Sequence, residues 1–180
     1  MYVDILALSH LADRPAHGYE LRRRVEASTG FRLHNNALYP ALRRFEDGGA
    51  VTKTAVPQQG RPPKHIYEIT GPGRELLHDM LADCTPEQAG DDAEFFSRFA
   101  QFDYLTPDER LGVLDARDEA LSRRLAHLAA MKEKAQARTW AVLGVEELAR
   151  RAQRERVWLA GIRSHASDTS TAAGDGGEGA

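Results

Sequence analysis

The chain has 180 residues and a net charge of −3, with 42% hydrophobic and 28% charged residues, a composition that is typical of globular proteins and argues against a disordered one. Its length suits one ordinary domain or two small ones. The sequence has no run of about 18 apolar residues, no secretion signal and a single cysteine, Cys84, which predicts a cytoplasmic protein with no membrane span and no internal disulfide.

Apolar residues at helical spacing predict three short helices at the start of the chain. The first covers Val3 to Ala12, and the second runs from Gly18 to a stop at Gly30. The third covers Asn35 to Asp47. Its buried face consists of Leu38, Leu42 and Phe45. Pro40 is tolerated there because it lies near the helix start, and Gly48-Gly49 ends the helix.

The pattern then changes from helical to extended. Val51 to Val56 and His65 to Thr70 predict two strands, and the proline-rich segment from Pro57 to Pro63 predicts a loop between them. A further helix is expected over Arg74 to Ala82. Three helices followed by a hairpin is the order of a winged helix-turn-helix. We therefore predict a mainly α fold with a two-stranded β wing, in which residues 1–83 form a DNA-binding domain.

The rest of the chain is predicted to be a helical arm. Asp83 to Ala93 is expected to be a connection, and the phenylalanines from Phe95 to Phe102 cluster on a short helix. Thr106 to Glu109 is a helix-start signature, with a threonine cap, proline at the first position and glutamate three residues after the cap. The helix that follows carries leucines at three- and four-residue spacing, and a last helix is expected after Gly144.

We expect residues 84–164 to form a dimerisation and effector-response domain, followed by a disordered tail over residues 165–180. The leucine stripe is wider than one further helix could cover, which favours a homodimer on a palindromic operator. Helices that fold back on their own domain are the alternative. Aromatic side chains in this domain predict either an ordinary core or a pocket for a small planar aromatic effector. These residues are Phe96, Phe99, Trp140 and Trp158.

The charge is unevenly distributed. The window from Arg22 to Lys64 holds nine basic and three acidic residues, a surplus of six positive charges, so the remainder of the chain carries a surplus of nine negative ones. A basic module attached to an acidic one keeps the local positive field that phosphate needs, although the whole chain is acidic. The window therefore favours a nucleic-acid partner, double-stranded DNA.

The third helix is the expected recognition helix, because the second helix of a helix-turn-helix lies in the major groove. Steps of about 100° per residue place polar side chains opposite its buried face. The predicted DNA contacts are Asn35, Asn36, Tyr39, Arg43 and Arg44. Asn36 could bond adenine, Arg43 could reach guanine or phosphate, and Tyr39 could contact a phosphate or sugar. The alternative is that these are only solvated polar residues on an exposed helix.

The wing is the second predicted DNA contact, through Arg61, Lys64 and His65. Prolines stiffen it, and an arginine at a stiff tip suits a narrow minor groove or its phosphates. An ordinary hairpin turn with solubilising charges is the alternative. For the run Arg22-Arg23-Arg24, contact with backbone phosphate and simple exposure to water both stay open.

Motifs for other chemistry are lacking. The seven histidines and Cys84 do not have metal-ligand spacing, and no phosphate loop, nucleophile elbow or catalytic triad signature is present. The sequence predicts no catalytic residue, metal or cofactor. Nothing in it supports Cys84 as a redox sensor.

Four segments closely resemble the PadR family of bacterial regulators. They are Ile5-Leu6-Ala7-Leu8, His17-Gly18-Tyr19-Glu20-Leu21, the stretch from Leu38 to Gly49, and the stretch from Gly60 to Thr70. The last two are specific in combination, and the match covers about the first eighty residues. The resemblance implies a homodimer that represses genes until a small molecule, such as a phenolic acid or planar drug, loosens DNA binding. It also implies that Tyr39 and its neighbours, with the wing from Arg61 to Lys64, lie at the DNA.

Two functions of different classes are therefore compared. The first is a sequence-specific repressor that a small-molecule effector releases. The second is a winged-helix protein-interaction module without specific DNA binding. The basic window with its exposed Asn, Tyr and Arg side chains favours the first, because a protein-binding winged helix does not need it.

Overall fold

The computed structural model describes residues 2–29, 35–58, 61–135 and 138–168, and for residues 29, 35–36, 58 and 61–63 it describes the backbone alone. The chain divides into two compact units, Met1–Leu81 and Ala82–Ala180. Within the described ranges, no helix combines the length and the apolar character that crossing a membrane requires.

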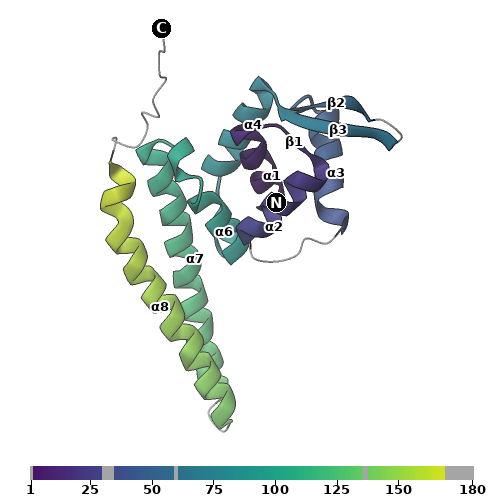
Figure 1. The fold of residues 1–180 in the computed structure, drawn as a ribbon. Helices are drawn as coiled ribbons and strands as arrows, with labels where there is room; N and C mark the ends of the chain where they lie inside the picture. Colours follow the sequence, from purple (N-terminus) through teal and green to yellow (C-terminus); the bar gives the residue numbers. More distant parts are fainter. Residues whose placement is uncertain (1, 30–34, 59–60, 136–137, 169–180) are drawn as a thin grey trace. The chain divides into compact units, whose positions relative to one another are not determined.

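The first unit combines helices with a small sheet. Its elements in chain order are α1 (Tyr2–Asp13), β1 (Ala16–His17), α2 (Gly18–Thr29), α3 (Asn35–Asp47), β2 (Val51–Gln58), β3 (Arg61–Ile69) and α4 (Gly71–Ala82) (Figure 1). The strands form an antiparallel sheet in the order β1-β3-β2. The predicted fold class, mainly helical with a winged-helix hairpin, is confirmed.

Helix α1 forms the centre of this unit. Ile5, Leu8 and Leu11 are at most 1% exposed, and Leu6 and Ala7 on the other sides of the helix are buried as well. A helix that is apolar around most of its circumference has to be covered by neighbours. Helix α1 contacts α2, α3 and β3, so α3 and the wing are both packed on the same central helix.

The wing is longer than the sequence predicted, and the expected loop from Pro57 to Pro63 is wrong. The strands extend to Gln58 and start again at Arg61. The pairing is in regular register up to Val56 opposite Lys64, then shifts between Val56 and Gln58. An irregularity of this kind accepts residues without a ladder N–H, and β2 is an edge strand, where proline is tolerated. The prolines therefore coincide with a shift in the pairing register but do not end the strands.

The sheet also has a third strand that the sequence did not predict. Ala16 pairs with Tyr67 and His17 pairs with Ile66, so β1 lies on the free side of β3. Two residues are too short for a period-2 pattern, which explains why the strand was missed. Its effect is to fix the start of α2 directly beside the middle of the wing.

Two glycines form the junction between α3, the wing and α4. Gly49 has a φ of 73° and ends α3, where the Ala50 N–H donates to the Phe45 carbonyl over 2.8 Å. Gly73 lies in the first turn of α4 against the start of β2. A Cβ atom at Gly73 would lie 2.0 Å from the Ala50 oxygen and 2.7 Å from Cγ1 of Ile69. Only glycine allows α4 to approach the sheet this closely.

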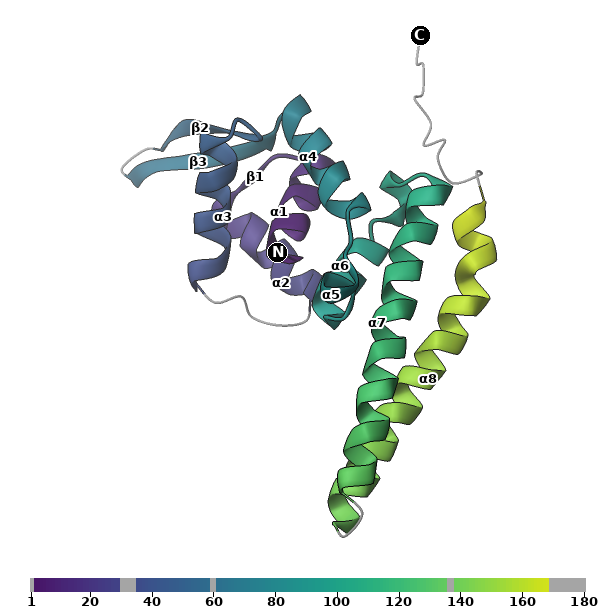
Figure 2. The same cartoon turned by 180° about the vertical axis from the view of Figure 1, so that it is seen from behind.

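The second unit contains the arm. Its elements are α5 (Pro86–Ala89), α6 (Asp92–Phe99), the 3-10 turn η1 (Phe102–Tyr104), α7 (Pro107–Lys134) and α8 (Thr139–Ser167). Helices α7 and α8 run side by side as a long antiparallel hairpin (Figure 2). Thr106 caps α7 with both bonds of a capping box, as its sequence signature indicates.

The leucine stripe of α7 is largely covered within the chain. Leu114, Leu121 and Leu128 are buried, and α7 packs along α8, whose Val145 and Leu159 are buried too. Two polar residues of α7 also lie on this stripe, Asp118 and Lys132, and both are paired across the hairpin. Asp118 accepts two bonds from Arg156, at 2.7 and 3.0 Å, and Lys132 lies 2.7 Å from Glu146. The stripe therefore gives no reason of its own for a second chain.

A buried arginine ties the helices of the arm together. Arg117 is 1% exposed, and its guanidinium donates to Glu155 of α8 over 2.7 Å, to Asp92 of α6 over 2.6 Å and to the Ala89 carbonyl of α5 over 2.6 Å. It also lies 4.9 Å from the centre of the Phe95 ring. A buried charge has to be satisfied in this way, because an unpaired one would cost several kcal/mol, on the order of 3–5.

Two expectations about the start of the arm are wrong. The connection expected over Asp83 to Ala93 contains α5 and the first two residues of α6. Thr85 forms a capping box with Gln88, the same type of signal as the one recognised at Thr106. Phe102 lies on η1 and not on the phenylalanine helix, which ends at Phe99.

The bounds of the last helix also differ from the prediction. Helix α8 begins at Thr139, so Gly144 lies inside it. A Cβ at Gly144 would meet nothing within 4 Å, so the glycine sits in open space and costs only about 1 kcal/mol of helix propensity. The helix ends at Ser167, so residues 165–167 of the predicted disordered tail are helical. Residues 169–180 lie outside the described ranges.

Substitution of Gly73 tests the packing of α4 on the sheet. Gly73→Ala places a methyl group against the Ala50 backbone, and we expect it to lower the free energy of unfolding by about 3 kcal/mol. The matched control is Gly71→Ala, where an added Cβ meets nothing within 4 Å and the expected change is at most about 0.5 kcal/mol. Urea denaturation followed by circular dichroism measures both. Equal stability of the two variants would contradict this packing.

Candidate nucleic-acid interface

Helix α3 has one buried and one exposed face. Leu38, Ala41 and Leu42 are at most 1% exposed, and the helix packs with this face against α1 and β2. Tyr39 is 46% exposed, and the side chains of Pro40 and Arg43 are also exposed. Pro40 lies inside the helix without ending it. The burial of the apolar side chains thus fixes which polar side chains face outward.

A hollow of about 420 Å³ lies beside the exposed face of α3. It is formed where α3, the wing and the start of α2 meet. The residues that line it are His17, Gly18, Tyr19, Glu20, Tyr39, Lys64, His65 and Tyr67. The hollow therefore joins predicted contacts from the recognition helix and from the wing in one surface.

Gly18 allows this close meeting of elements. A Cβ there would lie 3.0 Å from Cε1 of Tyr39 and 3.4 Å from Cε2 of Tyr67. The ring of Tyr39 thus lies over the first residue of α2. His17 fixes the wing next to it, because its Nδ1–H donates to the His65 carbonyl over 3.2 Å. Burial raises the pKa of the Tyr67 hydroxyl, so that hydroxyl remains protonated at neutral pH.

The acidic residue in the hollow is engaged by cations of the chain. Glu20 accepts a short bond from Arg24 and lies 3.4 Å from Arg14. The hydrogen bond from Arg24, together with the charge of that guanidinium, holds the pKa of Glu20 below its usual range. Glu20 is therefore compensated, while Lys64 and His65 present exposed polar side chains to the same hollow.

Most basic side chains of this unit with described positions are held by carboxylates. Arg14 and Arg24 pair with Glu20, Arg22 pairs with Glu26, Arg44 with Asp4 and Lys53 with Glu46. For the run Arg22-Arg23-Arg24, this leaves Arg23 as the exposed member. Among the described side chains, Arg43 and Lys64 form no such ion pair, so these two predicted contacts are available to pair with an external anion.

The predicted DNA contacts are distributed as follows. Tyr39 and Arg43 lie on the exposed face of α3, while Lys64 and His65 are exposed on β3. Arg44 lies on the flank of α3 that faces α1. Three predicted side chains lie outside the described residues, although their backbone belongs to α3 and β3. They are Asn35, Asn36 and Arg61.

The start of α2 belongs to this surface as well, although its residues are not among the predicted DNA contacts. Tyr19 is 70% exposed, and His17 and Gly18 line the hollow with it. A signal was available, because the three residues stand at the predicted start of the second helix. A pattern of apolar periodicity does not reveal them, since their role depends on a contact with the wing 48 positions later in the chain, between His17 and His65.

In the arm, three of the four predicted effector residues lie together. The Trp158 ring centre is 6.2 Å from that of Phe96 and 5.2 Å from that of Phe99. Trp140 is not part of this cluster, because it lies about 27 Å from Trp158 along α8, at about 1.5 Å per residue. Trp140 is instead 86% exposed near the start of α8.

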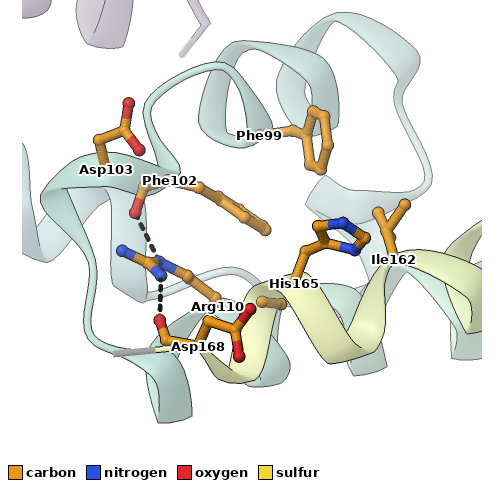
Figure 3. A pocket seen from close by; sticks show the side chains of 8 residues that line it. Phe99, Phe102, Asp103, Arg110, Ile162, His165 and Asp168 are labelled. Atoms are coloured by element: carbon orange, nitrogen blue, oxygen red, sulfur yellow. Dashed lines mark hydrogen bonds between the residues drawn. The ribbon is translucent and has the colours of Figure 1, made fainter. Parts of the chain in front are cut away.

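A second hollow, of about 380 Å³, lies beside this cluster within the arm (Figure 3). Its apolar wall consists of Phe99, Phe102, Ile162 and Ala166. Its polar groups are Asp103, Arg110, His165 and Asp168. Arg110 closes one side, where its guanidinium donates to the Phe102 carbonyl over 2.8 Å and to the Asp168 carbonyl over 3.2 Å.

Neither metal nor thiol chemistry gains support in the part of the chain that is described. No group of three or more His, Cys, Asp or Glu side chains is placed there to hold a metal ion. Burial raises the pKa of the Cys84 thiol, which keeps it protonated, whereas a reactive cysteine needs the thiolate.

Parts of the chain are similar to known proteins. A protein of Mycobacterium tuberculosis, named a probable transcriptional regulator, is 35% identical over 93 residues, which cover 47% of this chain and 49% of that protein. An uncharacterised 37.1 kDa protein in a transposon of Streptomyces fradiae is 38% identical over 73 residues, which cover 41% of this chain and 20% of that protein. The chain thus spans about half the length of the first relative and a fifth of the second.

Among solved structures, the chain is similar to Bacillus subtilis PadR in complex with operator DNA. The two are 20% identical with a TM-score of 0.43, over 90% of this chain and 96% of that one. Residues 7–79 match the transcriptional regulator PadR-like family. This range contains α2, α3 and the wing, and it agrees with the resemblance seen in the sequence. The chain therefore carries, over residues 7–79, a domain of the PadR-like family of transcriptional regulators.

Proposed function

We propose that this protein is a homodimeric, sequence-specific repressor that binds a palindromic operator in double-stranded DNA and is released by a small aromatic effector. DNA binding is assigned to residues 1–83, and dimerisation with effector response to residues 84–164. The observation that supports DNA binding best is the joint surface of α3 and the wing, where Tyr39, Arg43 and Lys64 are exposed. The cytoplasmic location stays a prediction.

The dimensions of α3 suit the major groove. An α-helix with its side chains is about 10–12 Å wide, and the groove is about 12 Å wide. With Leu38 and Leu42 buried, the outward side chains of Tyr39 and Arg43 would face base edges and the groove wall. Lys64 and the hollow beside it would then receive the sugar-phosphate backbone, since ammonium and hydroxyl groups are donors to phosphate oxygens.

Two substitutions separate phosphate contact from base contact. Lys64→Ala should weaken binding to operator and random duplexes equally. It should also make the negative slope of log K against log[salt] shallower by about 0.9. Arg43→Ala should weaken the preference for the operator, because an arginine contact to guanine is worth about 1–3 kcal/mol of discrimination. Fluorescence anisotropy with a duplex from upstream of the gene and a random duplex of equal length measures both.

The control for this experiment is Arg123→Ala, which removes an exposed cation from α7 in the arm and should leave both affinities unchanged. A wild-type protein that binds both duplexes equally would contradict specific recognition. A protein that binds no duplex would favour the alternative function, a winged-helix module that binds protein.

The surface proposed for homodimerisation lies on α8. Trp140 is 86% exposed, and Leu143, Trp158 and two glycines lie within about 100° around the helix from each other. A Cβ at Gly144 or Gly161 would meet nothing within 4 Å, so a second helix could approach there. Apolar side chains at this exposure favour a cover from another chain. We call this part of α8 the α8 stripe, and in a two-fold dimer the α8 stripes of the two copies would pack against each other.

A charge placed in the α8 stripe should separate the two copies. The wild type is expected to have twice its chain mass of 20.0 kDa by light scattering, and Trp140→Asp is expected to shift the mass toward that of the single chain. Gln153→Asp, at an exposed polar position of α8 outside the stripe, is the control and should stay dimeric. A wild type that is monomeric at micromolar concentration would overturn the homodimer.

For the effector, we propose the hollow that Phe99, Phe102 and Ile162 line in the arm. A volume of about 380 Å³ lies within the range of small-molecule sites, and aromatic walls suit a planar ring. The Arg110 guanidinium at one side suits a carboxylate on that ring. The ring of Trp158, 5.2 Å from Phe99, would report on occupancy.

The effector proposal is tested with p-coumaric acid, the ligand named for a Bacillus subtilis PadR structure, as the probe. Saturable quenching of tryptophan fluorescence and loss of operator binding are expected. Ile162→Phe should fill the hollow and abolish both effects, whereas Ala160→Phe, outside its lining, should retain them. An unchanged response in Ile162→Phe would rule out this hollow, and a wild type without response would rule out this ligand class.

A further inference from the structure

One cation of the recognition helix is held by a carboxylate from another helix. Nη2 of Arg44 on α3 lies 2.8 Å from Oδ1 of Asp4 on α1, 40 positions earlier in the chain. The other arginine pairs of this unit are closer in sequence, as in Arg22 with Glu26 and Arg24 with Glu20, both within α2. The pair of Arg44 is therefore a tertiary contact that joins the exposed part of α3 to the central helix.

The two side chains of this pair differ in freedom. The Asp4 side chain is 19% exposed and lies in the first turn of α1, whose neighbouring residues are buried. The Arg44 side chain is 60% exposed. The carboxylate is thus a fixed group, and the guanidinium is a long, largely solvated group that can leave it.

Arg44 is directed to a different groove wall than Tyr39. It lies about 140° around α3 from Tyr39, at about 100° per residue. Because a helix nearly fills the major groove, side chains on its two flanks lie next to the phosphates of opposite strands. With Tyr39 and Lys64 on the wing side, Arg44 is the described cation of α3 on the α1 side.

From this geometry we infer that Asp4 limits the DNA affinity of the protein by competing with a backbone phosphate for the Arg44 guanidinium. This inference rests on the proposed DNA binding and adds a residue that contacts no DNA itself. In the free protein Asp4 holds Arg44 on α1. On DNA the guanidinium exchanges one anion for another, so the net gain from Arg44 is small. Without the carboxylate, the same phosphate contact would cost no ion pair.

The size of the effect follows from the exposure of the pair. An ion pair with a largely solvated arginine contributes little, and its loss corresponds to about a two- to fivefold change in an equilibrium constant. Asp4→Asn should therefore tighten DNA binding about two- to fivefold. It should also raise the steepness of the salt dependence by up to about 0.9, the value for one phosphate contact.

A double-mutant cycle tests the inference in the full-length protein. The variants are Asp4→Asn, Arg44→Gln and the combination of both, titrated against a duplex from upstream of the gene and a random duplex at several salt concentrations. The matched control is Glu75→Gln, which removes one exposed negative charge from α4 in the same unit. Thermal unfolding of each variant shows that the fold is kept.

The expected result is tighter binding by Asp4→Asn on both duplexes, no gain by Glu75→Gln, and loss of the gain when Arg44→Gln is added. Binding by Asp4→Asn that is equal to that of Glu75→Gln, or weaker than that of the wild type, would overturn the inference. Failure of the proposed function gives a different result, because the wild type would then bind the upstream and the random duplex equally. The double-mutant cycle could still be measured on both duplexes. No binding of any variant to either duplex overturns both.

Discussion

The candidate interface depends on the burial of one face of α3. Leu38, Ala41 and Leu42 are inserted between α1 and the wing, and each of the two leucine side chains contributes about 1.5–3 kcal/mol when it leaves water. Rotating the helix would expose them, so the burial fixes the angle at which Tyr39 and Arg43 face outward. The polar side of α3 is therefore determined by its apolar side.

The surroundings of α3 give this surface its shape. Gly18 lets the Tyr39 ring lie over the start of α2, and His17 bonds the wing through the His65 carbonyl. Three segments that are distant in sequence thereby form one hollow. The same unit neutralises many of its own cations, and among the described side chains Arg43 and Lys64 are the predicted contacts that keep their charge. Local pairing, and not the net charge of the window, therefore decides which basic side chains of this unit have no carboxylate partner among the described residues.

Sequence patterns predicted the helices of the first unit and the bounds of α3, because Leu38, Leu42 and Phe45 repeat at helical spacing and Gly48-Gly49 ends the helix. They did not predict β1, whose two residues acquire their conformation from pairing with Tyr67 and Ile66. They also misjudged Pro57, since a register shift that admits proline is a property of two strands and not of one.

In the arm, the same reasoning recognised Thr106 as a cap but could not show what covers the leucine stripe. That stripe is covered by α8, and the deciding contacts are tertiary, such as those of Arg117 with Glu155 and Asp92. The ion pair of Arg44 with Asp4 is of the same kind. Composition reveals both charges, but only the fold reveals that they meet.

Hydrogen exchange of the protein with and without the duplex from upstream of the gene tests the central claim most directly, because it maps protected backbone along the chain. The account predicts that this duplex slows amide exchange at the start of α2, in α3 and in β3, more than a random duplex of equal length does. Slower exchange confined to α7 and α8, or the absence of any protection in α3, would contradict the assignment of DNA binding to this surface.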